Sequence, residues 1–363
     1  MNMTTMQVAR LHGVGDIRLS DEAVPEPGPG EELVRVTAVG ICGSDLHWWD
    51  QGGIGDAQLA RPLVLGHEGA GVIADGPRRG ERVAIDPAIP CGVCRPCRDG
   101  YRNLCPRIRF AGHGGTDGAM REFMSWPEEL LYPLPEELSD ADGAVLEPLG
   151  VALHSYDLGH LRLGGTAAVI GCGPIGLLLI QLLRAAGAQS VVAADPLPHR
   201  REAAAKSGAD WVADPGQLAG PGQLAGPGRD GGPGTGSGVL NEPPGVRELT
   251  GDGVDVAFEI AGTSDAVRLA MDATRPGGRV VLAGIPDDDL TTFRASVARR
   301  KGLTIAMVRR MNEVYPRAIS MAARRQVDLG SVVTHHFPLT DVAGAFGVAA
   351  RRAGLKVIVE PGR

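Results

Sequence analysis

A glycine-rich turn between an apolar run and a helix constrains the fold of this chain more than any other feature. Gly171, Gly173 and Gly176 follow a short apolar run, and residues 175–186 then have the composition of a helix. A second apolar run occupies residues 190–194. A strand, a turn, a helix and a strand within about thirty residues form a βαβ unit. Such a unit requires a parallel sheet with helices on its faces, so we expect an α/β fold.

The three glycines form the pattern G-x-G-x-x-G, which is typical of a dinucleotide site when it stands between a strand and a helix. One glycine permits the tight turn, one lets the backbone approach a pyrophosphate, and one lets helix and strand pack closely. Pro174 and Ile175 complete the turn at the helix N-terminus, where the phosphates would be held. A glycine turn of purely structural use is the alternative.

The choice between the two nicotinamide cofactors depends on the end of the second strand. Asp195 stands there, where a carboxylate can accept hydrogen bonds from an adenosine ribose and would repel a 2′-phosphate. This predicts NAD. Arg200 could instead stack on adenine or reach a phosphate, so NADP stays open. Further strands at residues 254–260 and 279–283 extend the predicted cofactor domain over residues 151–288.

The first third of the chain has a different pattern. Short β-type runs, such as residues 33–39 and 71–73, are separated by glycines and prolines, which predicts an antiparallel β domain. At 363 residues the chain exceeds one hydrophobic core. We therefore expect a second domain of residues 1–150, to which the chain returns after residues 287–289 to complete it with 289–363.

A low-complexity segment interrupts the predicted cofactor domain at residues 214–240. It contains little besides Gly, Pro, Ala, Gln and Leu, and Pro-Gly-Gln-Leu-Ala-Gly occurs in it twice. Such a composition buries too little apolar surface to offset the entropy of ordering it. The segment is therefore predicted to be an inert, flexible surface insertion.

Charge and hydropathy limit the partners. The formal net charge is -7, with no long basic run, so nothing favours nucleic acid or an acidic membrane surface. No run of 18 apolar residues could span a membrane, and the first ten residues lack an export signal. We expect a cytoplasmic protein that binds a small molecule and neither nucleic acid nor membrane.

Four of the six cysteines are clustered. Cys91, Cys94, Cys97 and Cys105 have the spacing C-x2-C-x2-C-x7-C on a segment rich in glycine and proline. In a chain without an export signal, such a cluster indicates a metal site and not disulfides. Four thiolates close a tetrahedral shell around zinc and leave no position for a substrate, so this site would be structural. An iron–sulfur cluster is the competing interpretation.

A second constellation combines different donors from separate segments. Cys42 follows Gly40-Ile41, His67 and Glu68 stand in Gly66-His67-Glu68, and Glu147 lies much later. A thiolate, an imidazole and carboxylates can hold zinc while keeping one position open for water or an alcohol. Taken singly, His67 would be an ordinary core or surface histidine and Glu147 a solvated acid. Their combination predicts a catalytic zinc site.

These segments resemble the zinc-containing medium-chain alcohol dehydrogenases, and among them the sorbitol, xylitol and L-idonate dehydrogenases. The likeness runs from about residue 33 to the C-terminus, except for the insertion, over ICGSDLH, VLGHE, the four cysteines, LEPLGVALH, GCGPIG and VTHHFPL. It implies a GroES-like β-rich catalytic domain, with a structural zinc lobe at about residues 90–106, joined to a Rossmann cofactor domain. It also implies two zinc ions per chain.

The same resemblance assigns the catalytic zinc ligands. Cys42, His67 and Glu68 carry over as ligands. Glu147 carries over either as a direct ligand or as the partner of zinc-bound water. In some polyol dehydrogenases the structural lobe is absent, whereas this chain has all four of its cysteines.

Further roles follow from the resemblance alone. Ser44 would take the proton of the alcohol and pass it through the cofactor ribose toward His47 at the surface. Arg309 would contact substrate hydroxyls, although Arg310 replaces the aromatic residue that follows it in the family. Trp48 would line the substrate pocket. The alternatives are a turn residue for Ser44, a bystander for His47, a solvated arginine for Arg309 and core packing for Trp48.

The resulting prediction is a zinc-dependent oxidoreductase that transfers a hydride from a polyol or related secondary alcohol to NAD and forms a ketone. An L-threonine or 2,3-butanediol dehydrogenase is the nearest alternative, since it would share both zinc sites and the cofactor. A non-catalytic zinc-binding interaction protein is the second alternative. The resemblance further implies a homodimer or homotetramer.

Overall fold

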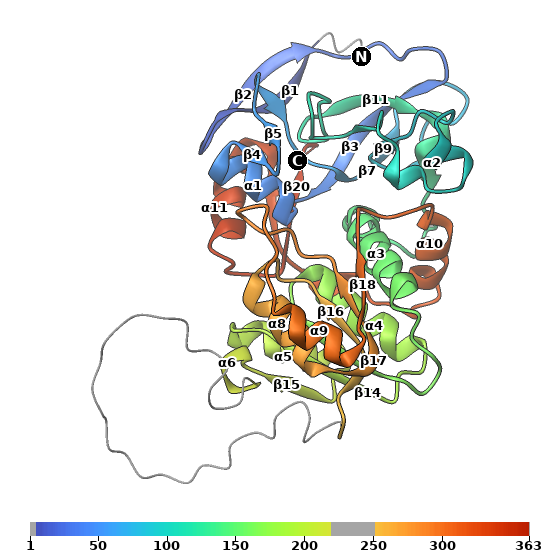
Figure 1. Ribbon diagram of the computed structural model, residues 1–363. Coiled ribbons are helices and arrows are strands. Elements are labelled where there is room, and N and C mark those ends of the chain that lie inside the picture. Colours follow the sequence, from blue (N-terminus) through green and yellow to red (C-terminus); the bar gives the residue numbers. More distant parts are fainter. Residues whose placement is uncertain (1–4, 219–250, 363) are drawn as a thin grey trace. The chain divides into compact units, whose positions relative to one another are not determined.

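The computed structural model describes residues 5–218 and 251–362, which form two compact units. The first unit comprises Met1–His154, Asp287–Asp289 and Val308–Arg363, and the second Ser155–Pro286 and Leu290–Met307. Figure 1 shows the elements of each unit. Most of the insertion predicted at 214–240 lies outside the described residues. Within them, no helix is long and apolar enough to cross a membrane.

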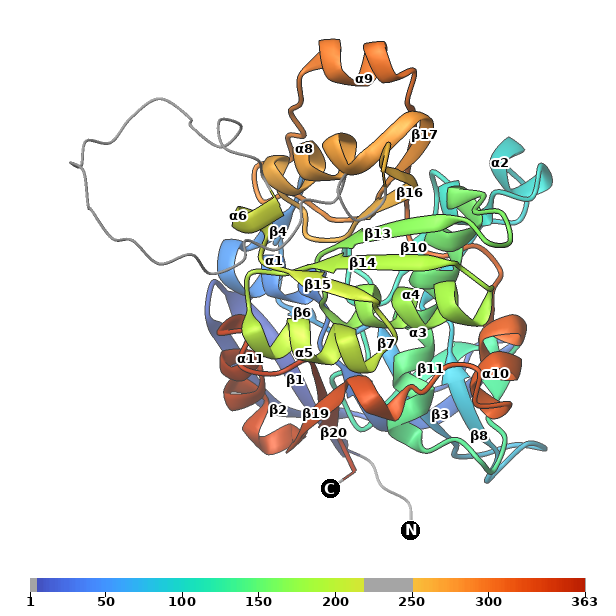
Figure 2. The same ribbon diagram turned by 90° about the horizontal axis from the view of Figure 1, so that it is seen from below.

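The second unit is a parallel sheet between two layers of helices. Among the described residues, six strands follow one another in the order β15-β14-β13-β16-β17-β18. Counted along the chain this order is 3-2-1-4-5-6, the doubly wound order of the Rossmann fold, which confirms that prediction. Helices α4 and α5 lie on one face and α8 and α9 on the other (Figure 2).

The strands of the second unit are β13 (Thr166–Ile170), β14 (Ser190–Ala194), β15 (Trp211–Ala213), β16 (Val254–Glu259), β17 (Thr274–Leu282) and β18 (Thr304–Met307). Its described helices are α4 (Pro174–Ala185), α5 (Pro198–Lys206), α6 (Pro215–Leu218), α8 (Ser264–Ala273) and α9 (Ala295–Lys301).

The structure corrects the expected point of return to the first unit. Residues 287–289 do belong to the first unit, but the chain then goes back to the sheet for α9 and β18. Strand β18 pairs in parallel with β17, with Arg279 opposite Thr304. Three of its four residues are exposed. The strand lies in a short apolar run at residues 303–308, and a run this short does not by itself distinguish a strand from a helix.

The first unit is built around a mostly antiparallel sheet. Its strands are neighbours in the order β12-β8-β7-β3-β20-β19, and β11 also pairs with β3. Only the pair β19–β20 is parallel among the described pairs of this sheet. A smaller sheet has the order β2-β1-β6. This architecture is the β-rich, GroES-like unit that the resemblance implied.

The strands of the first unit are β1 (Thr5–Gly13), β2 (Asp16–Ala23), β3 (Glu31–Gly40), β4 (Gly53–Ile54), β5 (Ala57–Gln58), β6 (Leu63–Val64), β7 (Glu68–Ile73), β8 (Arg82–Ile85), β9 (Ala88–Ile89), β10 (Arg109–Phe110), β11 (Phe123–Pro127), β12 (Leu131–Pro133), β19 (Val333–Pro338) and β20 (Lys356–Glu360). Its helices are α1 (Gly43–Gln51), α2 (Arg95–Arg98), α10 (Tyr315–Ala323) and α11 (Val342–Ala350), with short 3-10 turns η1 (Arg102–Leu104), η2 (Glu128–Leu130), η3 (Gly330–Val332) and η4 (Leu339–Asp341). Helix α3 (Asp140–Gly159) runs from the first unit into the second.

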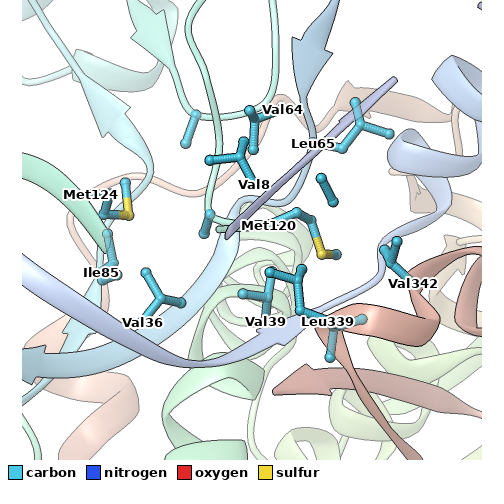
Figure 3. Packing of buried hydrophobic residues seen from close by; sticks show 14 of the residues in the cluster. Val8, Val36, Val39, Val64, Leu65, Ile85, Met120, Met124, Leu339 and Val342 are labelled. Atoms are coloured by element: carbon cyan, nitrogen blue, oxygen red, sulfur yellow. The ribbon is translucent and has the colours of Figure 1, made fainter. Parts of the chain in front are cut away.

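The core of the first unit fixes the ends of three strands. Val36 and Val39 of β3 pack with Met120 and Leu339 in a cluster to which β1, β6 and α11 also contribute (Figure 3). Each such fully buried side chain stabilises the fold by roughly 1.5–3 kcal/mol. The register set by this core places Gly40, at the end of β3, opposite both Glu68 and Ile358. The three strand ends therefore meet at one edge, where the candidate site lies.

Candidate active site

Three of the predicted zinc ligands converge at this edge of the first unit. The potential ligand atoms of Cys42, His67 and Glu68 all lie within 4.8 Å of one another. Gly40 is required here, because a side chain at this position would collide with the Glu68 carboxylate. The sequence thus brings together a thiol, an imidazole and a carboxylate from the ends of β3 and β7.

Asp45 orients the imidazole of His67. Its carboxylate accepts hydrogen bonds from the backbone N–H groups of Cys42, at 3.0 Å, and Gly66, at 3.2 Å. The same carboxylate lies 3.4 Å from Nδ1 of His67. Burial alone would lower the pKa of His67, but Asp45 raises it well above its ordinary value. A carboxylate that engages Nδ1 leaves Nε2 for a metal, the usual arrangement of zinc-binding histidines.

Glu68 is held by a buried lysine. Nζ of Lys356 donates to both carboxylate oxygens, at 2.7 and 2.6 Å, and to the carbonyl of Ile41 at 3.0 Å. Lys356 is 3% exposed and Glu68 is fully buried. Burial opposes the charge of Lys356, but Glu68 outweighs it and raises the pKa of the lysine. The lysine therefore stays protonated and holds the Glu68 carboxylate beside Cys42 and His67.

Ser44 and His47 lie on the first turns of α1. Oγ of Ser44 is 3.4 Å from Nε2 of His67, so the hydroxyl lies at the candidate metal site. Nδ1 of His47 is 3.5 Å from Oδ1 of Asp287, a side chain that is 82% exposed. The His47 side chain itself is only 13% exposed, so it is less accessible than expected, and Asp287 connects it to solvent.

Glu147 stands in the middle of α3 and is buried. It is outside the group of donors within 4.8 Å, but its charge interacts with His67 and Glu68. Burial raises its pKa, His67 opposes this and Glu68 adds to it, and the result is a pKa of about 7. Glu147 therefore changes protonation state near neutral pH.

The four-cysteine lobe forms a second cluster in the first unit. The sulfur atoms of Cys91, Cys94, Cys97 and Cys105 lie within 4.8 Å of one another, and no disulfide joins these four. The backbone N–H of Val93 lowers the pKa of Cys91 to about 6. Burial and the neighbouring thiols raise the pKa of Cys97 to about 12. Four crowded thiols with opposed pKa values can all ionise only around a cation.

Both donor sets fit zinc, each in a different manner. The lobe offers four sulfur ligands and no free position, as in structural zinc sites. Cys42, His67 and Glu68 offer three ligands of mixed type, which leaves a position for water or an alcohol, as in catalytic sites. An iron–sulfur cluster would also suit four cysteines. The mixed site has no such alternative, since it offers one thiolate and even the iron–sulfur clusters with histidine ligands need two.

The glycine turn of the second unit has the geometry predicted for a dinucleotide site. Gly171 has φ +103°, which favours glycine, and a side chain there would meet the backbone of Ala261. Gly173 is the N-cap of helix α4, and a Cβ there would meet only Nη1 of Arg200, at 3.8 Å, so the backbone is open to close approach of a ligand. A side chain at Gly176 would collide with the carbonyl of Gly171. Pro174 and Ile175 form the first turn of α4.

Asp195 lies at the end of β14 beside this turn. Its carboxylate accepts hydrogen bonds from the backbone N–H groups of Cys172, at 2.8 Å, and Leu197, at 2.9 Å. Nη1 of Arg200 is 4.0 Å from the same carboxylate. These contacts hold the Asp195 side chain next to the glycine turn. Cys172 is fully buried, which agrees with a packing role.

The two predicted substrate contacts lie differently from expectation. Trp48 is 2% exposed, belongs to the core cluster and meets the ring of His113 edge-on at 5.5 Å between centroids. Arg309 is exposed, and its carbonyl accepts a hydrogen bond from Asn103 at 2.9 Å. Its neighbour Arg310 is instead half-buried, with the guanidinium 4.2 Å above the ring of Phe110. The structure thus favours core packing for Trp48 and turns attention from Arg309 to Arg310.

Sequence reasoning missed three side chains at this site. Asp45 and Lys356 hold the ligand side chains, and Phe110 packs beside His67 with 5.3 Å between ring centroids. Asp45 stands within the segment ICGSDLH and could have been found as an acid at the third position of a helix that begins after Cys42. Lys356 and Phe110 carry no local signal.

Comparisons with known proteins agree with this geometry. Residues 28–136 match the family model described as an alcohol dehydrogenase GroES-like domain. Residues 174–225 and 239–324 match the model described as a zinc-binding dehydrogenase.

Individual relatives cover nearly the whole chain. Sorbitol dehydrogenase of Bos taurus is 34% identical over 361 residues, which cover 96% of this chain and 94% of that protein. The crystal structure of 2R,3R-butanediol dehydrogenase from Bacillus subtilis has a TM-score of 0.82 and 31% identity over 98% of this chain and 99% of that one. A protein assigned as a zinc-binding dehydrogenase from Sinorhizobium meliloti 1021, bound to NADP, has a TM-score of 0.84 and 29% identity over 99% and 100%.

Proposed function

This chain belongs to the zinc-binding alcohol dehydrogenases of the medium-chain type, and from this premise we propose that it oxidises a secondary alcohol of a polyol, or of a related compound, to a ketone with NAD. The observation that carries the proposal is the convergence of Cys42, His67 and Glu68 within 4.8 Å. Three ligands of mixed type suit a metal with an open position, which a purely structural site would not have.

The residues around the site suit the removal of a proton and a hydride from an alcohol. When bound, zinc lowers the pKa of an alcohol hydroxyl and NAD accepts a hydride. Asp45 keeps Nε2 of His67 directed at the donor cluster, and Lys356 holds the Glu68 carboxylate in place. Glu147, with a pKa of about 7, can hold or release a proton beside them.

A route for the released proton starts at Ser44. Its hydroxyl is 3.4 Å from Nε2 of His67, where a bound alcohol would also lie. Farther along α1, His47 is 3.5 Å from the exposed Asp287. By the resemblance, the cofactor ribose would carry the proton from Ser44 to His47. This relay is supported by the position of both residues on one helix.

For the cofactor we propose NAD. The support is Asp195, a buried carboxylate next to the glycine turn, which would repel a 2′-phosphate. The NADP-bound relative from Sinorhizobium meliloti keeps NADP as the alternative. A comparison of kcat/KM for the two cofactors decides between them, and a preference for NADP would contradict the role given to Asp195.

For the substrate the relatives give two candidates. The similarity to sorbitol dehydrogenase favours a polyol. The structure of 2R,3R-butanediol dehydrogenase, 31% identical, supports a small diol as the second candidate. L-Threonine is a third candidate substrate, since L-threonine and 2,3-butanediol dehydrogenases would share both zinc sites and the cofactor. A non-catalytic zinc protein has no support in the mixed donor set.

A substrate panel with metal analysis tests the proposal. The zinc-loaded protein would be assayed with NAD and sorbitol, xylitol, L-idonate, L-threonine or 2,3-butanediol, and its zinc content measured. We expect two zinc ions per chain and clear activity with one of the first three. Activity with L-threonine alone would overturn the substrate class, and no activity with any alcohol would overturn the function.

The homodimer or homotetramer and the cytoplasmic location implied by the sequence stay predictions. Light scattering of the purified protein would test the first, and a single chain in solution would contradict it.

A further inference from the structure

Arg310 places a positive charge next to the candidate active site. Its guanidinium carbon lies 4.2 Å from the centroid of the Phe110 ring. The same ring centroid lies 5.3 Å from that of His67. Because both distances start from Phe110, the guanidinium can be no farther from the His67 ring than their sum. A molecule as long as a six-carbon polyol, bound at Cys42 and His67, could therefore reach Arg310.

This guanidinium has no acidic partner in the described part of the chain. No carboxylate lies within ion-pair distance of Arg310 there, and its buried Nη1 finds no hydrogen-bond acceptor. Burial, together with the charge of Arg309 and against that of Glu147, lowers the pKa of Arg310 to about 10, so the group is still charged at neutral pH. Lys356, by contrast, is paired with Glu68, whereas Arg121 shares with Arg310 a buried nitrogen that has no hydrogen-bond acceptor. A buried charge that the protein leaves uncompensated costs stability and suits an anionic ligand.

The backbone holds Arg310 in position. The residue has φ +56°, a backbone conformation that residues other than glycine rarely adopt. Asn103 donates to the carbonyl of Arg309, and Asn312 donates to the carbonyl of Gly100, both at 2.9 Å. Met311 packs so tightly against Gly150 of α3 that a side chain at Gly150 would collide with it. Strain maintained by surrounding contacts is common at binding sites.

We propose that Arg310 binds a negatively charged group of the substrate, a carboxylate or a phosphate, at the end of the molecule remote from the reacting hydroxyl. This inference rests on the proposed function and narrows it: the substrate is an anionic polyol, such as an aldonate or a polyol phosphate, and not a neutral sugar alcohol. The guanidinium has forked donors that match both anions. Phe110 covers one face of the Arg310 guanidinium. The N–H groups in the plane of the guanidinium would then bind the ligand.

Kinetics with matched substrates test the proposal. We would measure kcat/KM with NAD for two anionic compounds, L-idonate and sorbitol 6-phosphate, and two neutral ones, sorbitol and xylitol. The variants are Arg310→Gln and Arg310→Lys. The control is Arg325→Gln, because Arg325 has the same φ of +56° but is exposed. Thermal melting checks that each variant folds.

The wild type should prefer at least one anionic compound, and the preferred one identifies carboxylate or phosphate. Arg310→Gln should lower kcat/KM for that compound about 10- to 100-fold, the value of a hydrogen bond to a charged group, and change the neutral substrates less than about threefold. Arg310→Lys should recover part of the loss, and Arg325→Gln should match the wild type.

Two results would overturn the inference while leaving the proposed function intact. One is a wild type that oxidises neutral polyols as well as the anionic ones. The other is an Arg310→Gln variant that folds normally and loses both substrate classes equally, which would indicate that Arg310 only holds its own segment. If the wild type oxidises none of the four, the proposed function fails instead. Calorimetric titration of the two anionic compounds into wild type and Arg310→Gln then decides the inference, since only an Arg310-dependent affinity supports it.

Discussion

The two cysteine-containing sites of the first unit are built in opposite ways. All four donors of the lobe come from residues 91–105, and two large side chains there, Val93 and Tyr101, are 63% and 58% exposed. The donors of the candidate active site come from the ends of different strands, and Glu68 and its partner Lys356 are almost completely buried. One site is local and has few apolar contacts of its own, whereas the other is assembled by the core.

This difference indicates what each metal would do for the structure. The lobe has little apolar burial to order it, so its shape depends on the metal, as in small zinc domains. In the active site, strand register, the carboxylate of Asp45 and the ammonium of Lys356 hold the donors in place. A metal bound there adds reactivity to a geometry that already exists. The following predictions test that contrast, beginning with the largest effect.

Cys42→Ser should remove activity and little else. The variant should lose at least about a thousandfold in kcat, since the open metal contributes several kcal/mol to the transition state. Binding of NAD, followed by quenching of tryptophan fluorescence or by equilibrium dialysis, should persist because the glycine turn lies in the other unit. A variant with normal turnover would contradict the contrast between a structural lobe and a catalytic mixed site, because the mixed site would then have no part in catalysis.

Lys356→Met should destabilise the first unit strongly. Removing the ammonium leaves the Glu68 carboxylate buried without a partner, which costs about 3–5 kcal/mol. Urea unfolding of the metal-free protein measures the loss. The double variant Lys356→Met with Glu68→Gln should recover much of it. The exposed Lys206→Met is the control and should change stability by less than about 0.5 kcal/mol.

Asp86→Asn should change how stability depends on pH. Burial raises the pKa of Asp86 to about 7, and the carboxyl has no ion-pair partner in the described residues, unlike Glu68. The folded chain therefore keeps a proton that the unfolded chain releases, so stability should fall as pH rises from about 4 to about 7. Asparagine removes this dependence.

Melting of wild type and Asp86→Asn at pH 5 and pH 8 measures the effect. The variant should gain up to about 3 kcal/mol relative to wild type between these two pH values. If the stability difference between variant and wild type were the same at pH 5 and pH 8, Asp86 would be ionised at both pH values.

Cys97→Ser should have the smallest effect on catalysis. The variant should lose one zinc ion per chain and become less stable, while the zinc ion at Cys42 and His67 stays bound. Because Asn103, Asn312 and Arg102 connect the lobe to residues 309–313, the loss should loosen Arg310 and raise KM about tenfold with less change in kcat. Metal analysis and steady-state kinetics check both parts. A thousandfold fall in kcat would contradict a purely structural lobe.

Much of the fold followed from local pattern. The glycine turn predicted β13, α4 and β14 almost to the residue, because a βαβ unit carries both periodicities within a short stretch. Strand β18 was missed, although it lies in an apolar run at residues 303–308, because a run this short does not distinguish a strand from a helix. The return to the first unit was therefore expected too early in the chain.

For the site, the sequence by itself determined the donor groups and their chemistry. The thiol, the imidazole and the four closely spaced cysteines follow directly from residue type and spacing along the chain. Only the tertiary structure decided which side chains surround them. Lys356 reaches Glu68 from a strand 288 residues away, and Arg310, in place of Arg309, lies over Phe110. Contacts at such separations arise from strand register and core packing, which no local pattern records.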